Sequence, residues 1–188
     1  MSKQEELDNI ACTVRWCSNC ELYFGRKNIV FGEGDPDAKL MLIGEFPEER
    51  EDVIGKPFVG RPGKLLEKML AYISLDRSKV YLSNIVKCHP KNNRTEDQEV
   101  QCCINYLKKQ IDIIQPKVIV TLGATATQRL LDIKENISKL KGTWQEFKGI
   151  KVLPTFHPSY LLKNFTDENR ESVKRDFDKA KAMLTDIK

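Results

Sequence analysis

The chain has 188 residues, of which 40% are hydrophobic, and a formal net charge of +4. This length and composition predict one folded domain over residues 1–188 and exclude disorder of the whole chain. The mild positive charge permits a nucleic-acid partner but does not require one, because many proteins carry such a charge.

No apolar run approaches the about 20 residues that a membrane-spanning helix needs, so we expect no membrane partner. The first ten residues, MSKQEELDNI, are polar and acidic, which argues against a secretory signal. We therefore expect a soluble, cytoplasmic protein. Its six cysteines are then expected to be ligands, catalytic thiols or core residues rather than disulfides.

Four short, nearly all-apolar runs are expected to be strands of a sheet that is covered on both faces. In chain order they are KLMLIG (39–44), KVYLSNIV (79–86), KVIVTLG (117–123) and KVLPTFH (151–157). Helices are expected between and after them, at 63–73, 96–114, 124–132 and 168–187. This alternation predicts an α/β fold with a parallel sheet, in which ligands bind beyond the carboxyl ends of the strands.

The loop after the first expected strand, GEFPEEREDVIGKPFVGRPGKLL (44–66), has glycines that allow sharp turns and close approach to a ligand. Phe58, held between Pro57 and a Val-Gly pair, could stack on a flat ligand such as a base, or could be a loop anchor in the core. Glu45 could be a general base or orient a water, or could be a solvated acid or helix cap. The acidic side chains within 48–52 are expected to form a solvated face.

Four cysteines have a spacing that predicts one thiolate site. Cys17 and Cys20 form a C-x2-C pair, Cys88 follows the second strand, and Cys103 lies on the apolar stripe of the 96–114 helix. Four thiolates suit either zinc or an iron–sulfur cluster, and spacing alone does not separate the two. The alternative is that these cysteines are small core side chains. The two other cysteines are expected to be spare thiols, Cys12 and Cys102.

The segment FHPSYLLK (156–163) follows the fourth expected strand. His157, at the carboxyl end of that strand, is well placed for catalysis, although a satisfied core histidine is the alternative. Ser159 can cap the following helix or donate to a phosphate. His89, beside Cys88, is expected to be a surface residue or to support the thiolate site.

These motifs together resemble the family-four uracil-DNA glycosylases, the iron–sulfur branch of that superfamily. The resemblance rests on GEFPEEREDVIGKPFVGRPGKLL, YLSNIVKCHPKNNR, the spaced cysteines and HPSYLL, and it runs from about Cys17 to about Leu162. It implies a three-layer α/β/α sandwich with a central four-stranded parallel sheet. It also implies a [4Fe-4S] cluster, and therefore iron rather than zinc, held by Cys17, Cys20, Cys88 and Cys103.

The resemblance further implies roles in excising uracil from single- or double-stranded DNA, by a protein that we expect to be a monomer. Phe58 would stack on the flipped-out uracil, Asn84 would hydrogen-bond its Watson–Crick edge, and His157 would face O2. Glu45 would lie in the loop that positions the attacking water, and the 160–163 loop would wedge into the duplex. The predicted residues are catalytic Glu45 and His157; substrate-binding Phe46, Phe58, Asn84 and His157; and DNA-binding Gly60, Arg61, Ser159, Tyr160 and Lys163.

The chain departs from the family pattern beside the expected pocket. The family usually has alanine or glycine at the position of Phe46, and often glycine at that of Glu48. A phenylalanine there could crowd the pocket, tighten the selectivity for uracil or abolish catalysis. Two other hypotheses therefore stay open: a uracil-DNA or DNA binding module of the same fold that lacks turnover, and a structural protein that binds zinc.

Overall fold

The computed structural model describes residues 1–185 and contains one mixed sheet with the strand order β1-β3-β2-β4-β6-β5. Each of the four expected runs forms a strand, and neighbours among these four are parallel. The strands are β2 (Leu40–Gly44), β3 (Tyr81–Asn84), β4 (Val118–Leu122) and β6 (Ile150–Thr155). The prediction of a central four-stranded parallel sheet is therefore confirmed.

The sheet extends beyond the predicted strands on both sides, so a purely parallel sheet of four strands was an incomplete expectation. β1 (Glu33–Gly34) adds antiparallel to β3, and β5 (Gln145–Phe147) adds antiparallel to β6. The β5–β6 hairpin closes through Lys148 and Gly149, which both have positive φ, as a two-residue type I′ turn requires. Such short edge strands carry almost no periodicity for a sequence to reveal.

The expected helices are also present, with shifted ends. They are α3 (Arg61–Tyr72), α4 (Asp97–Ile114), α5 (Ala124–Leu131) and α8 (Asp167–Thr185). Residues 186 and 187, which end the expected 168–187 helix, lie outside the described residues. No helix in the described part of the chain is long and apolar enough to cross a membrane.

Further helical segments were not predicted. They are α1 (Lys3–Arg15), α2 (Glu49–Ile54), α6 (Ile137–Leu140), α7 (Pro158–Lys163) and the 3-10 turns Glu21–Phe24 and Arg77–Lys79. The expectation of a loop at 160–163 was wrong, because these residues form the last two-thirds of the six-residue helix α7. Pro158 at the start of α7 and His157 as its N-cap favour a helix there.

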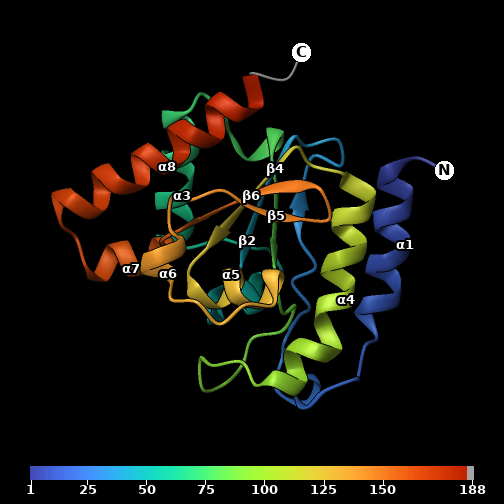
Figure 1. Ribbon diagram of the computed structural model, residues 1–188. Coiled ribbons are helices and arrows are strands. Elements are labelled where there is room, and N and C mark those ends of the chain that lie inside the picture. Colours follow the sequence, from blue (N-terminus) through green and yellow to red (C-terminus); the bar gives the residue numbers. More distant parts are fainter. Residues whose placement is uncertain (186–188) are drawn as a thin grey trace.

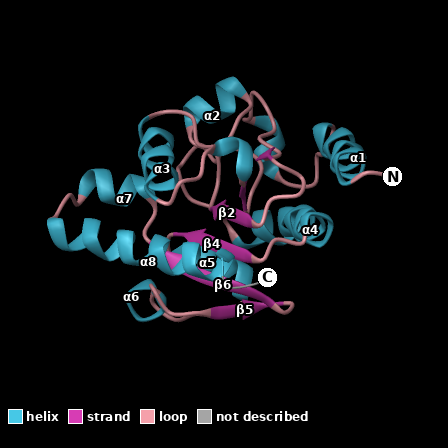
Figure 2. Cartoon of the chain, turned by 90° about the horizontal axis from the view of Figure 1, so that it is seen from above, coloured by secondary structure: helices cyan, strands magenta, loops and turns pink. Residues whose placement is uncertain are grey.

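Helices cover both faces of the sheet, which confirms the three-layer architecture (Figures 1 and 2). Side chains of β2 alternate between two hydrophobic cores: Met41 and Ile43 pack with α1, α4 and α5, whereas Leu40 and Leu42 pack with α3 and α8. The carboxyl ends of β2, β3, β4 and β6 therefore meet at one edge between the helical layers. The loops that follow them lie at the lower side of Figure 1.

The acidic run within 48–52 is only in part the solvated face that was expected, because Glu49 is exposed and Glu48 is half-buried. Glu51 and Asp52 are buried, because both carboxylates accept backbone hydrogen bonds. The Asp52 carboxylate accepts from the backbone N–H groups of Lys27 and Asn28, at 3.0 and 3.2 Å. This acid thus ties the cysteine-bearing N-terminal segment to the loop after β2.

Candidate active site and four-thiol centre

A cavity of about 490 Å³ opens at the carboxyl edge of the sheet. Loops after three of the parallel strands line it, as expected for a ligand site in such a fold. The predicted residues that the structure brings together there are Glu45, Phe46, His157, Ser159 and Tyr160. Its lining also includes Gly123, Ala124 and Thr125, which follow β4 at the carboxyl edge where a ligand was expected, and Asn136, which the sequence did not single out.

Asn84 ends β3 beside this edge and is 2% exposed. Its side-chain Nδ2 is buried without a hydrogen-bond partner among the described residues. A Cβ atom added to Gly44 would lie 2.4 Å from Asn84 Oδ1 and 2.9 Å from Phe58 Cζ. The absence of a side chain at Gly44 therefore leaves room for the Asn84 amide and the Phe58 ring to approach each other. An unpaired buried amide costs about 1–3 kcal/mol, so this group has the character of a ligand-binding donor.

Phe58 is a loop anchor in the core, which is one of the two interpretations that its sequence context allowed, and its stacking on a flat ligand stays a prediction. It is 3% exposed in the core shared with α3 and α8, and its ring centroid lies 6.3 Å from that of His157. Its backbone is left-handed, with φ of 53°. Arg77 donates to the Phe58 carbonyl at 3.0 Å, while the buried Glu51 carboxyl accepts from the Phe58 N–H. The ring is thus held by a backbone clamped at both ends.

The buried Glu51 carboxyl in this clamp is electrostatically unusual. Burial raises its pKa from 4.5 to about 7, although the N–H groups of Glu48, Phe58 and Val59 partly offset that effect. Gly63 completes the turn, because a Cβ there would lie 1.8 Å from the Phe58 carbonyl oxygen. The sequence marked these glycines as turn residues but gave no sign of the carboxyl group.

His157 is held as a neutral imidazole. Its Nδ1 atom accepts from the Ser159 N–H at 3.1 Å and lies 2.7 Å from Ser159 Oγ. Burial lowers its pKa from 6.5 to about 4. Because Nδ1 accepts a hydrogen bond, the single ring proton lies on Nε2. Gly123 packs against this residue, with a Cβ position 3.3 Å from His157 Cβ.

Glu45 and Phe46 leave β2 in different surroundings. The Glu45 carboxylate accepts from Thr95 Oγ1 at 2.9 Å, which fixes it against the loop before α4. Phe46 packs on the core beneath α4 and lies 6.5 Å from the His89 ring. His89 is anchored by its Nδ1, 2.8 Å from the Pro47 carbonyl oxygen. Phe46 therefore forms a wall of the cavity.

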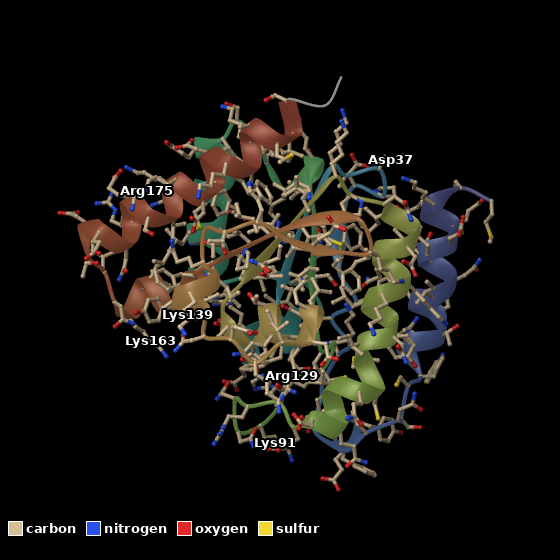
Figure 3. All side chains as sticks on the ribbon, in the orientation of Figure 1. Asp37, Lys91, Arg129, Lys139, Lys163 and Arg175 are labelled. Atoms are coloured by element: carbon tan, nitrogen blue, oxygen red, sulfur yellow. The ribbon has the colours of Figure 1, made fainter. Side chains whose placement is uncertain are left out.

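The predicted DNA-contact residues divide into two groups. Ser159 and Tyr160 line the cavity, and exposed Lys163 follows at the end of α7. Figure 3 shows Lys163, Lys139, Arg129 and Lys91 along the lower side of the molecule, near the carboxyl edge. Gly60 and Arg61, at the start of α3, are not among the described residues that line the cavity.

The four predicted thiols line one small cavity, together with Cys102 and Tyr106. Cys17 and Cys20 follow α1, Cys88 follows β3, and Cys103 lies on α4. Burial raises the pKa of the Cys88 thiol to about 12 and that of Cys103 to about 11. Cys102 instead donates to the Asn19 carbonyl, and Cys12 is exposed.

Hydrogen-bond donors surround these sulfur atoms. Arg26 Nη1 lies 3.6 Å from Cys88 Sγ, the Lys87 N–H lies 3.3 Å from Cys103 Sγ, and the Tyr106 hydroxyl lies 3.5 Å from Cys17 Sγ. Among the described residues, no three side chains of His, Cys, Asp or Glu are grouped so that they could hold one metal ion. The four thiols thus have the donor chemistry of a thiolate centre.

Lys87, which was not predicted as a site residue, links this centre to β3. The side chain is fully buried, and its ammonium group donates to Ser83 Oγ, the Asn84 carbonyl and Gln110 Oε1 at 2.6, 2.8 and 2.7 Å. Its backbone N–H points at Cys103. The sign of its burial that the sequence offered was a lysine within the otherwise mostly apolar run NIVKC.

A family model and several similar proteins all point to the same family. The family model described as the Uracil DNA glycosylase superfamily matches residues 31–181. A protein from Thermotoga maritima named type-4 uracil-DNA glycosylase is 44% identical over 186 residues, which are 97% of each chain. Proteins of the same name from Saccharolobus solfataricus and Sulfurisphaera tokodaii are 44% and 42% identical, over 96% and 95% of this chain and 88% and 85% of theirs.

Proposed function

The chain belongs to the uracil-DNA glycosylase superfamily, and we propose that it hydrolyses the bond between uracil and deoxyribose in DNA. This is the first step of base-excision repair and leaves an abasic site without cutting the strand. Relatives that are 42–44% identical over nearly the whole chain and are named type-4 uracil-DNA glycosylase support it. We propose further that one domain acts as a monomer in the cytoplasm on single- or double-stranded DNA.

The observation that carries the proposal is the unpaired amide of Asn84 beside Phe58 and Gly44. A base must leave the helix to be read in such a buried place. The side-chain amide offers N–H donors on Nδ2 and an acceptor on Oδ1, which match O4 and N3–H of uracil respectively. The amino group of cytosine would instead meet the Nδ2 donor. Phe58 would stack on the flipped-out base, held by its clamped backbone.

His157 would stabilise the departing uracil. As the glycosidic bond breaks, negative charge grows on uracil O2, and the neutral imidazole has its N–H on Nε2 to donate there. One preorganised donor of this kind contributes about 3–4 kcal/mol to a transition state. Glu45, fixed by Thr95, would position the water that attacks the sugar.

Contacts to the DNA backbone are proposed at the two helix starts near the site. Gly60 and Arg61 at α3, and Ser159 at α7, would bind phosphates through backbone or side-chain donors. Exposed Tyr160 and Lys163 on α7 would meet the duplex where the base leaves. The wedge is then a short helix, which is stiffer than the loop that the sequence suggested.

We propose that Cys17, Cys20, Cys88 and Cys103 hold a [4Fe-4S] cluster. Four thiols that line one cavity, two of them buried, and the hydrogen-bond donors near their sulfur atoms support this proposal. When bound, the cluster supplies a rigid cross-link between the N-terminal segment, the loop after β3 and α4. Iron and sulfide analysis with a broad visible absorbance tests this, and stoichiometric zinc in its place would refute it.

A second candidate is a binding module that keeps the fold but not turnover. Phe46 narrows the cavity where the family pattern has a small residue. Glu48 lies beside it, and burial raises the pKa of its carboxyl. Tight binding of uracil-DNA without base release would favour this alternative.

The deciding experiment measures uracil release from an oligonucleotide by the intact, anaerobically purified protein. We expect release, and a loss of about 100-fold or more in Asn84→Ala and His157→Ala. Asn9→Ala, on the exposed face of α1, serves as the control and should match the parent. No release by the parent but release by Phe46→Ala would mean that Phe46 blocks an intact site. No release by either would refute the glycosylase and leave the binding module.

A further inference from the structure

An exposed aromatic and basic surface lies outside the candidate active site, on the segment that follows α1. Trp16 and Phe24 are 80% and 83% exposed, and the exposed Tyr23 ring has its centroid 5.3 Å from that of Phe24. The Arg15 guanidinium lies 5.8 Å from the Trp16 ring centroid, and that of Arg26 lies 5.0 Å from the Tyr23 ring centroid. We call the group Arg15, Trp16, Tyr23, Phe24, Arg26 and Lys27 the aromatic–cationic surface.

These residues surround a cleft of about 910 Å³. Arg15, Arg26 and Lys27 line it, and no carboxylate is among the described residues that do. Large aromatic rings that are left in water at the rim of a positive cleft are typical of a binding surface rather than of packing. The charge pattern complements a polyanion, and the rings complement flat, apolar faces.

The surface is continuous with the candidate active site. A second cleft of about 400 Å³ is lined by Phe24, by Lys91 and His89 from the loop after β3, and by two acids, Glu21 and Glu99. His89 in turn touches Pro47 and lies beside Phe46 in the wall of the active-site cavity. In Figure 1 the segment after α1 and the loop after β3 reach the same lower side of the molecule.

We propose that the aromatic–cationic surface binds unpaired nucleotides of the DNA strand that flanks the target base. Unpaired bases stack on Trp16 and Phe24, while Arg15, Arg26 and Lys27 meet the phosphates. A duplex does not fit equally well, because its base faces are covered by their neighbours. The proposal goes beyond uracil excision, since it requires no uracil in the DNA.

Tryptophan fluorescence tests the contact directly, because the chain has two tryptophans and only Trp16 lies on this surface. The partly buried Trp144 packs in the core near α8. The probe is a uracil-free oligothymidylate of about 12 nucleotides, within the range of single-strand site sizes. We expect it to quench the fluorescence of Trp144→Phe, in which Trp16 is the sole reporter, and to leave that of Trp16→Phe unchanged.

Affinity measured by fluorescence anisotropy gives a second readout. Trp16→Ala and Phe24→Ala should each weaken oligothymidylate binding by about tenfold and change duplex binding little. Phe165→Ala is the matched control, because Phe165 is 67% exposed, lies over Arg170, and belongs to the segment between α7 and α8. Each variant should retain the visible absorbance of the parent, which shows that the neighbouring thiol centre is intact.

Unchanged Trp16 fluorescence in the presence of bound oligothymidylate would overturn the proposal, as would parental affinity in both alanine variants. Either result would favour a protein, rather than DNA, as the partner that binds the aromatic–cationic surface. Because the probe contains no uracil, failure of this proposal and failure of the glycosylase proposal are separate results. A protein that releases no uracil but whose Trp16 fluorescence is still quenched would refute only the glycosylase proposal.

Discussion

Replacing Lys87 with methionine would test whether this buried lysine holds the base-reading end of β3. Methionine keeps an unbranched side chain but has no charge and no donor. The change removes three hydrogen bonds, to Ser83 Oγ, the Asn84 carbonyl and Gln110 Oε1. Since the backbone N–H of residue 87 stays, its contact with Cys103 Sγ is retained.

The expected loss follows from which acceptors keep a partner. The Ser83 hydroxyl can still donate to Gln110 Oε1 at 3.0 Å, so that pair remains satisfied. The Asn84 carbonyl loses a charge-assisted bond, and such bonds contribute about 1.5–3 kcal/mol. Relief from burying an ammonium group offsets part of this loss, because methionine leaves no unpaired charge behind. We expect the free energy of unfolding to fall by about 2 kcal/mol.

Denaturant unfolding of the intact protein would measure this change, with Lys148→Met as the matched control. Lys148 forms an exposed ion pair with Asp112, so its loss should cost less than about 1 kcal/mol. Lys87→Met should also raise the KM for uracil-DNA, because the Asn84 backbone is no longer fixed. Stability within about 0.5 kcal/mol of the parent, together with an unchanged KM, would refute the reasoning.

Three further predictions concern the active site. Burial holds the pKa of His157 near 4, below its ordinary 6.5, so its contribution to stability is present above pH 6.5 and lost as pH falls through 4. The parent should lose up to about 3 kcal/mol more than His157→Asn across that window in pH-dependent unfolding. Burial raises the pKa of Glu51 to about 7, so its contribution is lost as pH rises through 7. Glu51→Gln should therefore gain stability relative to the parent above pH 7, and equal pH profiles would contradict this. Gly44→Ala should abolish uracil release but not folding, because the new Cβ would lie 2.4 Å from Asn84 Oδ1; retained release would place the base elsewhere.

The order of strands along the chain was predictable because each parallel strand is buried on both faces and therefore reads as an unbroken apolar run. The positions of Asn84 and His157 followed from the same pattern, since each stands at the carboxyl end of such a run. The edge strands β1 and β5 were not predictable, because two or three residues carry no period. Helix α7 was missed although His157 and Pro158 form an N-terminal capping pattern.

The larger error concerned buried charges, because Glu51 and Asp52 were assigned to solvent and Lys87 was not considered. Asp52, Glu51 and Lys87 are buried because each one binds backbone groups of a loop near the site. Asp52 accepts from the N–H of Lys27, Glu51 accepts from that of Phe58, and Lys87 donates to the carbonyl of Asn84. By hydrophobic periodicity such residues count as polar and are expected in solvent. The backbone groups to which they hydrogen-bond leave no pattern in the sequence. The site therefore depends on two groups of residues. Those that would touch uracil were predicted from motifs in the sequence. The buried charged side chains that hold them in place became evident only in the folded chain.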